Sequence, residues 1–334
     1  MSVLFCLLIF IASNILLSNY AKILKLIDKP NERKKHIGEV PIVGGTSLIL
    51  SLFCFYFIGS IDNTIKLILL TSIPIFISGF LDDLLRLSVL IRVIIHIIAA
   101  SLMVYFGIKL LSLGSYEIIG TLNLGFIAVP FTIISVVLLT NSFNWIDGID
   151  GLATIMFLQS LLAIVVFLII NKSYFELDSI FTLLILNSFL FLFFNLGLIS
   201  SGKMFLGDSG SVLLGYLLSW ILIYFVVSEK YILHPVLVAW SIAFPIFDII
   251  STIIKRILLK RNPFSPDRLH LHHFLQDKNL NDKLVLFILF IISVILSLVG
   301  GLLFYYLGAI YALVAFIIIF ISYIFINLIY VIKL

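Results

Sequence analysis

The sequence of 334 residues has few charged residues, few cysteines and little proline or glycine. Charged side chains make up 11% of the chain, whereas a soluble domain carries about 25%. The two cysteines, Cys6 and Cys54, lie in apolar runs and predict no disulfide framework. With only 8 prolines and 19 glycines, a collagen-like fibre is excluded. Apolar residues reach 62%, more than a water-soluble globule of this size can bury, so a soluble enzyme is excluded too.

Long apolar runs account for this excess. A spanning helix needs about 20 apolar residues, and lipid favours helices because every backbone group must be paired. The candidate spans are 3–24, 41–58, 65–80, 91–106, 124–139, 153–170, 180–199, 212–227, 235–254, 284–307 and 310–332. The sequence therefore predicts an all-α, polytopic membrane protein with about 11 transmembrane helices, organised as one integral membrane domain over residues 1–334.

Lysine and arginine are distributed unevenly over this topology. The first run lacks a basic leader and a cleavage site, so we expect a retained span with its N-terminus outside. On that outer side occur only Lys66, Lys109, Lys172 and Lys230, and the other basic residues share the side of the C-terminus. By the positive-inside rule, the C-terminus is expected in the cytoplasm. The net charge of +4 gives no indication of nucleic-acid binding.

Polar segments stand where the predicted spans meet the cytoplasm. They are 28–36, 82–83, 141–151, 205–211 and 264–273. Because acidic residues are costly at membrane depth, their convergence on one face suggests a single site. By themselves, Asp82 and Asp83 fit either a solvated helix end or metal and phosphate chemistry, since a cation relieves the repulsion between two carboxylates.

The segment 141–151 carries a polar residue at every third position. These residues are Asn141, Asn144, Asp147 and Asp150. On a helical turn this spacing stacks them along one face, and their hard oxygen atoms suit Mg²⁺. A turn with local side-chain capping is the alternative.

The remaining motifs have a functional and a structural interpretation. The glycine-rich segment 205–211 opens a predicted span, so its N–H groups are placed to cradle a phosphate, with a simple N-cap by Ser209 or Ser211 as the alternative. The histidines near residue 270 lack the spacing of a zinc-binding helix, which favours a basic loop that binds an anionic substrate. Other residues inside the apolar runs are interpreted as packing features: His96, Asn187 and the pair Gly44-Gly45.

With these motifs in order, the chain resembles the polyprenyl-phosphate N-acetylhexosamine-1-phosphate transferases, relatives of the enzyme that starts the lipid steps of peptidoglycan synthesis. The resemblance covers essentially the whole chain. The stretch 263–273 is similar to the branch that begins O-antigen, enterobacterial common antigen or teichoic acid assembly, because the peptidoglycan branch carries a different histidine loop.

The resemblance implies a role for each motif. The implied catalytic residues, beside the metal and in the nucleotide pocket, are Asp82, Asp83, Asp147 and Asp150. The implied ligands of Mg²⁺, with Mn²⁺ as an alternative, are Asn144 and Asp208. The implied substrate-binding residues are Asn141, Asn195 on the base, Phe205 stacked on uracil, and Arg268, His270, His272 and His273 on the pyrophosphate and sugar. One position departs from the pattern: the common-antigen branch has a third acid where this chain has Arg86, which becomes an alternative phosphate contact.

The reaction implied by the resemblance is Mg²⁺-dependent transfer of a sugar-1-phosphate from a UDP-N-acetylhexosamine to undecaprenyl phosphate, with release of UMP. The enzyme would start a surface-glycan pathway at the cytoplasmic face of a bacterial inner membrane. Its partners would include membrane lipid, and a homodimer is an open alternative. UDP-GlcNAc is the default donor, and UDP-GalNAc, UDP-FucNAc and UDP-QuiNAc are alternatives. Direct attack by the lipid phosphate is favoured over a covalent aspartyl intermediate. A transporter or lipid flippase is disfavoured because such proteins place ionisable groups near the midplane, and an inactive scaffold because the acids are intact.

Overall fold

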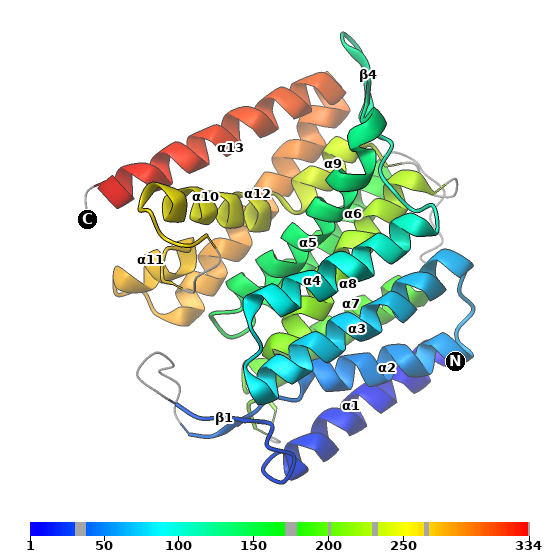
Figure 1. The fold of residues 1–334 in the computed structure, drawn as a ribbon, viewed down its shortest axis with the longest axis vertical. Helices are drawn as coiled ribbons and strands as arrows, with labels where there is room; N and C mark the ends of the chain where they lie inside the picture. Colours follow the sequence, from blue (N-terminus) through cyan, green and yellow to red (C-terminus); the bar gives the residue numbers. More distant parts are fainter. Residues whose placement is uncertain (31–37, 171–178, 200–201, 229–232, 264–266, 333–334) are drawn as a thin grey trace.

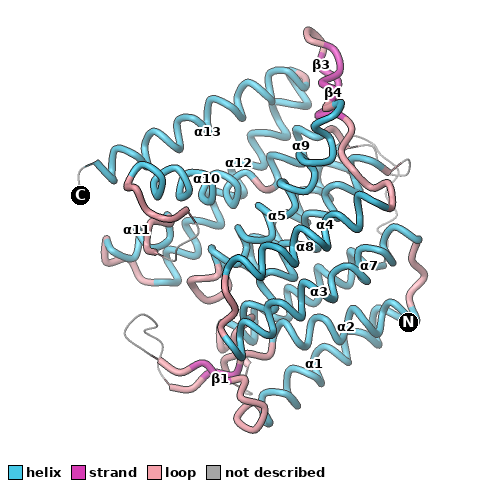
Figure 2. Tube along the Cα trace, in the orientation of Figure 1, coloured by secondary structure: helices cyan, strands magenta, loops and turns pink. Residues whose placement is uncertain are grey.

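The structure of the protein, a computed structural model, describes residues 1–30, 38–170, 179–199, 202–228, 233–263 and 267–332. Helices dominate (Figures 1 and 2), and two short strand pairs accompany them. The elements are α1 (Ser2–Tyr20), β1 (Ile27–Asp28), β2 (Val40–Pro41), α2 (Gly44–Ile58), α3 (Asn63–Leu85), α4 (Val89–Tyr105), β3 (Ser112–Tyr116), β4 (Gly120–Asn123), the 3-10 helix η1 (Gly125–Ile127), α5 (Ala128–Ile146), α6 (Leu152–Ile170), α7 (Ser179–Asn195), α8 (Gly207–Val227), α9 (Pro235–Ser241), α10 (Ala243–Leu258), α11 (Leu271–Asp277), α12 (Asp282–Leu307) and α13 (Ala309–Ile332). Parts of the predicted polar segments 28–36 and 264–273, and Lys172 and Lys230, lie outside the described residues.

The predicted helical membrane architecture is confirmed at the level of class. Among the described residues, 7 helices are long and apolar enough to cross a membrane, or 8 if the bent pair α9–α10 is one span. Helices α2, α4 and α7 are apolar but shorter. The chain is therefore a multi-pass helical membrane protein, whereas the number of eleven spans and the orientation of the termini stay predictions.

Helix α8 forms the centre of the bundle. It packs against α2, α3, α5 and α6, and every residue from Ser209 to Phe225 is buried. Small residues allow α2 and α3 to approach its first turn: a Cβ on Gly45 would lie 2.4 Å from the Gly210 nitrogen, and one on Gly79 would lie 2.5 Å from the Ser209 Cα. The predicted close packing at Gly45 is confirmed. This packing holds the N-terminus of α8 against the end of α3.

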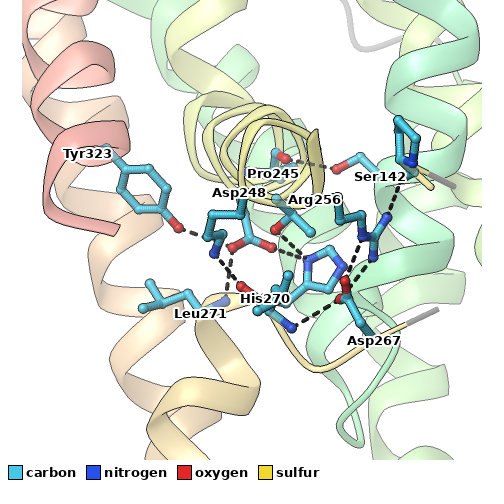
Figure 3. A network of polar contacts seen from close by, with 12 residues as sticks. Ser142, Pro245, Asp248, Arg256, Asp267, His270, Leu271 and Tyr323 are labelled. Atoms are coloured by element: carbon cyan, nitrogen blue, oxygen red, sulfur yellow. Dashed lines mark hydrogen bonds and ion pairs between the residues drawn. The ribbon is translucent and has the colours of Figure 1, made fainter. Parts of the chain in front are cut away.

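The predicted span 235–254 is not one continuous helix, which corrects the sequence interpretation. The chain breaks between α9 and α10 with a bend of 74°. Because backbone groups freed inside a membrane need partners, neighbouring serines donate to the carbonyls around the break. The bonds are Ser297 to Trp240 (3.2 Å), Ser160 to Ser241 (2.9 Å) and Ser142 to Pro245 (2.9 Å, Figure 3). Periodicity alone could not reveal the bend, because both halves are apolar.

The two strand pairs mark opposite ends of the bundle. The β3–β4 hairpin projects at one end, and β1 and α11 lie at the other (Figure 1). Helix α3 runs between them, from its N-cap Asp62 to Asp82 and Asp83 in its last turn. We call these the hairpin end and the acid end.

Candidate functional site

Four polar side chains from three helices meet at the acid end. They are Asp82 and Asp83 from α3, Asn144 from α5 and Asp208 from the first turn of α8, and we call them the acid cluster. Sequence analysis ended the predicted span at residue 139, before Asn141 and Asn144, but α5 continues to Ile146 and includes both. The predicted span was too short because polar residues interrupt the apolar pattern in the last turns of α5.

Asp83 caps α8 from a neighbouring helix. Its Oδ1 accepts the Asp208 N–H at 2.8 Å and its Oδ2 accepts the Ser209 N–H at 3.0 Å. Residue 206, the N-cap position of α8, makes no side-chain cap hydrogen bond, so Asp83 takes that function. Gly207 has φ +79° and leaves room for this carboxylate, since a Cβ there would lie 2.8 Å from Asp83 Oδ2. The two N–H groups that were predicted to cradle a phosphate therefore bind Asp83, and neither Ser209 nor Ser211 provides the alternative cap.

Asp82 lies between a like charge and an opposite one. Its carboxyl group stands beside that of Asp208, and it forms an ion pair with Arg92 Nη1 on α4 at 2.5 Å. The Arg92 Nε atom is buried and has no hydrogen-bond partner in the described part of the chain. Neighbouring Leu90 and Ile91 are exposed, which places Arg92 at the boundary between the acid cluster and the lipid-facing surface of α4.

The acid cluster has the oxygen donors that Mg²⁺ requires. Asn144 Nδ2 donates to Asp208 Oδ1 at 2.8 Å and to Ser211 Oγ at 3.1 Å, so in this structure the amide orients Asp208. In the described part of the chain, no three His, Cys, Asp or Glu side chains form a metal cage by themselves. Mg²⁺ does not need such a cage, because it binds through one or two carboxylates, waters and substrate phosphates. Asp82 and Asp208, side by side, fit that mode, whereas Asn144 would have to turn its carbonyl oxygen inward to join them.

A second group lies around the start of α8. Asp150 forms an ion pair with Lys203 at 2.5 Å, and the Lys203 ammonium stands 5.0 Å from the centre of the Phe205 ring. Asn195, predicted to bind a base, instead joins two backbone segments: its Oδ1 accepts the Gly151 N–H at 2.5 Å and its Nδ2 donates to the Met204 carbonyl at 2.8 Å. Asn195 thereby holds the segment of Asp150 close to that of Phe205.

The histidine segment is more ordered than the basic loop that was predicted. His272 and His273 belong to the short helix α11, and His270 is its N-cap residue. His270 and His272 are buried, at 4% and 1% exposure, whereas Arg268 is exposed and pairs with Asp277 at 2.9 Å. Burial, with the neighbouring His273 and His270, lowers the pKa of His272 well below its usual value, so its ring is neutral at pH 7.

This segment packs against the end of α5 that carries Asn144 and against the turn that follows it. A Cβ on Gly148 would lie 2.5 Å from His272 Nε2, so the histidine ring packs directly against the turn that follows α5. Trp145, next to Asn144 in the chain, packs with its ring 5.9 Å from that of His270 and 4.3 Å from the Arg256 guanidinium. Asp147 is the C-cap residue of α5 in the same turn.

The other predicted residues face the bundle interior. Asn141 Nδ2 donates to the Val137 carbonyl at 2.7 Å and lies 3.3 Å from His96 Nδ1. His96 also contacts Ser78 at 3.5 Å, in agreement with its interpretation as a packing histidine. Asn187 donates to Ser51 on α2 at 3.0 Å, which confirms the predicted bond between helices.

Sequence reasoning missed several charged residues that the fold brings to the acid end. They are Arg92, Lys203, Asp248, Lys255 and Arg256. For Asp248 a signal was present, because an acid inside a predicted span is a candidate functional residue by default. For the basic residues no signal separated them from those that face solvent.

The acid cluster lies within the part of the chain that matches a known family. Residues 65–226, which include Asp82, Asp83, Asn144 and Asp208, match the model of glycosyl transferase family 4.

Several curated proteins resemble most of the chain. The undecaprenyl-phosphate alpha-N-acetylglucosaminyl 1-phosphate transferase of Escherichia coli (strain K12) is 32% identical over 290 residues, covering 84% of this chain and 77% of that protein. The proteins of the same name from Yersinia pestis and Haemophilus influenzae are 31% and 32% identical, over 82% of this chain and 76% and 78% of their own length.

Proposed function

Because the chain belongs to glycosyl transferase family 4 and is a membrane-embedded transferase, we propose that it moves GlcNAc-1-phosphate from UDP-GlcNAc to undecaprenyl phosphate, with release of UMP. The observation that carries the proposal is the acid cluster, which gathers Asp82, Asp83 and Asp208 where three apolar helices end. A lipid-anchored acceptor and a soluble donor can meet only at such an interface. The names of the relatives support the acceptor and the sugar.

The acid cluster is the proposed site of the donor pyrophosphate. Asp82 and Asp208 would hold Mg²⁺, which when bound neutralises charge on the pyrophosphate. Asp83 keeps α8 in place through its two N–H contacts, so its contribution is to hold the Asp208 side chain in position. Phosphoryl transfer has a loose transition state, and positioning of this kind is most of what it asks of a protein.

The residues around the acid cluster are proposed to bind the other parts of the UDP-sugar. Lys203, Asp150 and Phe205 are proposed to receive the nucleotide, because a cation, an acid and an aromatic ring face one another there. The segment that carries Arg268 and the start of α11 packs against the 147–151 turn at Gly148 and is proposed to contact the pyrophosphate and sugar. The acid end is proposed to face the cytoplasm, where UDP-sugars are available.

The experiment that tests the function uses the purified full-length protein in detergent. Radiolabelled UDP-GlcNAc and undecaprenyl phosphate are expected to give GlcNAc linked to the lipid through a diphosphate, and UMP in equal amount. UDP-GalNAc, UDP-FucNAc and UDP-QuiNAc, offered one at a time, test the donor sugar. Lipid product without UMP, or no product from any of the four donors, contradicts the proposal.

Arg92 is proposed to receive the acceptor phosphate, because this cation pairs with the acid cluster and lies beside exposed apolar residues of α4. Arg92→Ala is expected to lower kcat/KM for undecaprenyl phosphate by about 10- to 100-fold, since a charge-assisted contact to phosphate is lost. The KM for the UDP-sugar is expected to change little. Steady-state kinetics with each substrate varied in turn measure both effects.

A matched control for this variant is Arg261→Ala, which removes an exposed arginine beyond the end of α10. It is expected to retain wild-type kinetics. Equal losses in the two variants would show that Arg92 acts only through the general positive charge of this surface.

A further inference from the structure

Asp248 is a buried carboxylate that the proposed transfer does not yet use. It lies on α10, six residues beyond the break from α9, and is 1% exposed. An unpaired buried charge is strongly unfavourable, so its partners must stabilise it. Three donors surround it (Figure 3): His270 Nδ1 at 2.7 Å, the Leu271 N–H at 3.0 Å and the Tyr323 hydroxyl at 3.1 Å.

Two of these donors belong to the start of α11. His270 is the N-cap residue of that helix, but its side chain makes no cap hydrogen bond. Asp248 accepts the Leu271 N–H in its place and binds the His270 ring with its second oxygen. Thr252, one turn further along α10, lies 3.4 Å from the same ring nitrogen. One carboxylate thus caps the helix and fixes the ring of the residue that begins it.

Two basic residues of α10 bind the segment that leads into α11. Arg256 Nε and Nη2 bind both oxygens of Asp267, at 2.8 and 3.0 Å, and Lys255 donates to the Leu269 carbonyl. Burial acts to raise the pKa of Asp267, but the hydrogen bonds from Arg256 and Leu269 hold it below its usual value. The segment from Asp267 to Leu271 is therefore attached to α10 at successive positions.

This attachment determines where His272 lies. Its ring is stacked on that of His270, with centres 5.6 Å apart and planes 16° from parallel. Its Nε2 atom is buried against Gly148 and has no hydrogen-bond partner among the residues that the structure describes. A buried ring nitrogen without a partner is rare in proteins, and at a substrate site it indicates a group that a ligand completes. His270, in contrast, already has its Nδ1 atom bound.

We propose that Asp248 and His270 form a buried positioning pair, which holds α11 against the 147–151 turn so that His272, and not His270, contacts the donor substrate. The inference rests on the proposed function and assigns different tasks to two histidines of one segment. Asp248 acts through His270 and the Leu271 N–H, and it touches no substrate itself.

Kinetics of the purified protein test the pair. Asp248→Asn preserves the size of the side chain and an acceptor oxygen but removes the charge that orients His270. It is expected to lower kcat/KM for the UDP-sugar by about 10- to 100-fold, a range taken from the loss of carboxylate partners of metal-bound histidines, where the partner likewise fixes the orientation of the ring. The KM for undecaprenyl phosphate is expected to stay within about threefold of wild type, which a general loss of structure would not allow.

A double-mutant cycle measures whether the two residues act as a unit. His270→Ala is expected to match Asp248→Asn, and the double variant is expected to be no worse than the poorer single variant by more than about threefold. Effects that multiply, or a His270→Ala variant with unchanged donor kinetics, would overturn the pair. Asp62→Asn is the matched control, because Asp62 also caps a helix and accepts a tyrosine hydroxyl, from Tyr224, but lies at the hairpin end.

Hydrogen exchange separates this inference from the proposed function. The amides of 271–277 are expected to exchange at least about 10-fold faster in Asp248→Asn than in wild type or Asp62→Asn, because the N-terminal cap of α11 is weakened. Unchanged exchange at α11 would overturn the placement whatever the protein catalyses. Absence of product from wild-type protein, with faster exchange in the variant, would overturn the transfer reaction and keep the positioning pair.

Discussion

Removal of divalent cations with EDTA is expected to abolish sugar-phosphate transfer, and added Mg²⁺ is expected to restore it. The reason is electrostatic: Asp82, Asp83 and Asp208 stand together, and a pyrophosphate that approaches them adds more negative charge. Among the described residues, Arg92 pairs with Asp82, whereas Asp83 and Asp208 are bound by the neutral N–H groups of α8 and of Asn144. Without a divalent cation, the donor and the acid cluster would repel each other.

The measurement is UMP release from UDP-GlcNAc at increasing Mg²⁺ after EDTA treatment and dialysis. Mn²⁺ in place of Mg²⁺ is expected to support activity, since it also accepts carboxylate and phosphate oxygen ligands. Thermal unfolding in detergent provides the control: the protein is expected to remain folded at the assay temperature in EDTA, so that loss of transfer cannot be attributed to unfolding. Transfer that continues at the wild-type rate in EDTA would exclude a catalytic cation.

Replacement of Asp208 by asparagine is expected to lower kcat/KM by about 100- to 1,000-fold, the usual loss when one group that stabilises transition-state charge is removed. The effect should be chemical and not structural. Asparagine keeps the Oδ1 atom that accepts the Asn144 amide, and its backbone N–H still reaches Asp83. Loss of one negative charge beside Asp82 also relieves repulsion, so the unfolding temperature is expected to be equal or higher.

The matched control is Asp282→Asn. Asp282 also lies in the first turn of a membrane helix, α12, but it is exposed and bonds only to Gln276 among the contacts that the structure describes. Its replacement is expected to leave transfer unchanged. If Asp208→Asn retains wild-type turnover and Mg²⁺ dependence, Asp208 is not a metal ligand and the acid cluster needs another assignment.

Much of the site follows from local pattern. Asp82, Asp83, Asn144 and Asp208 stand out because each is polar next to a long apolar run, and their position at span ends predicts a shared face. The fold brings them together, although Asn144 belongs to α5 itself, which extends beyond the predicted end of the span at residue 139. The pairing of Asp83 with two N–H groups of α8 could not be predicted, because it depends on how closely α3 approaches a helix more than 120 residues away in sequence.

The sequence by itself determined that this is a helical membrane protein, since 62% apolar residues arranged in long runs allow no other class. It also predicted that the polar motifs gather at the ends of helices. Only the tertiary structure decided which partners each polar group has. It revealed the break between α9 and α10, the capping of α8 by Asp83 and the burial of Asp248 against His270. The physical reason is that hydropathy depends on the residues of one segment, whereas a hydrogen bond between helices depends on the packing of two.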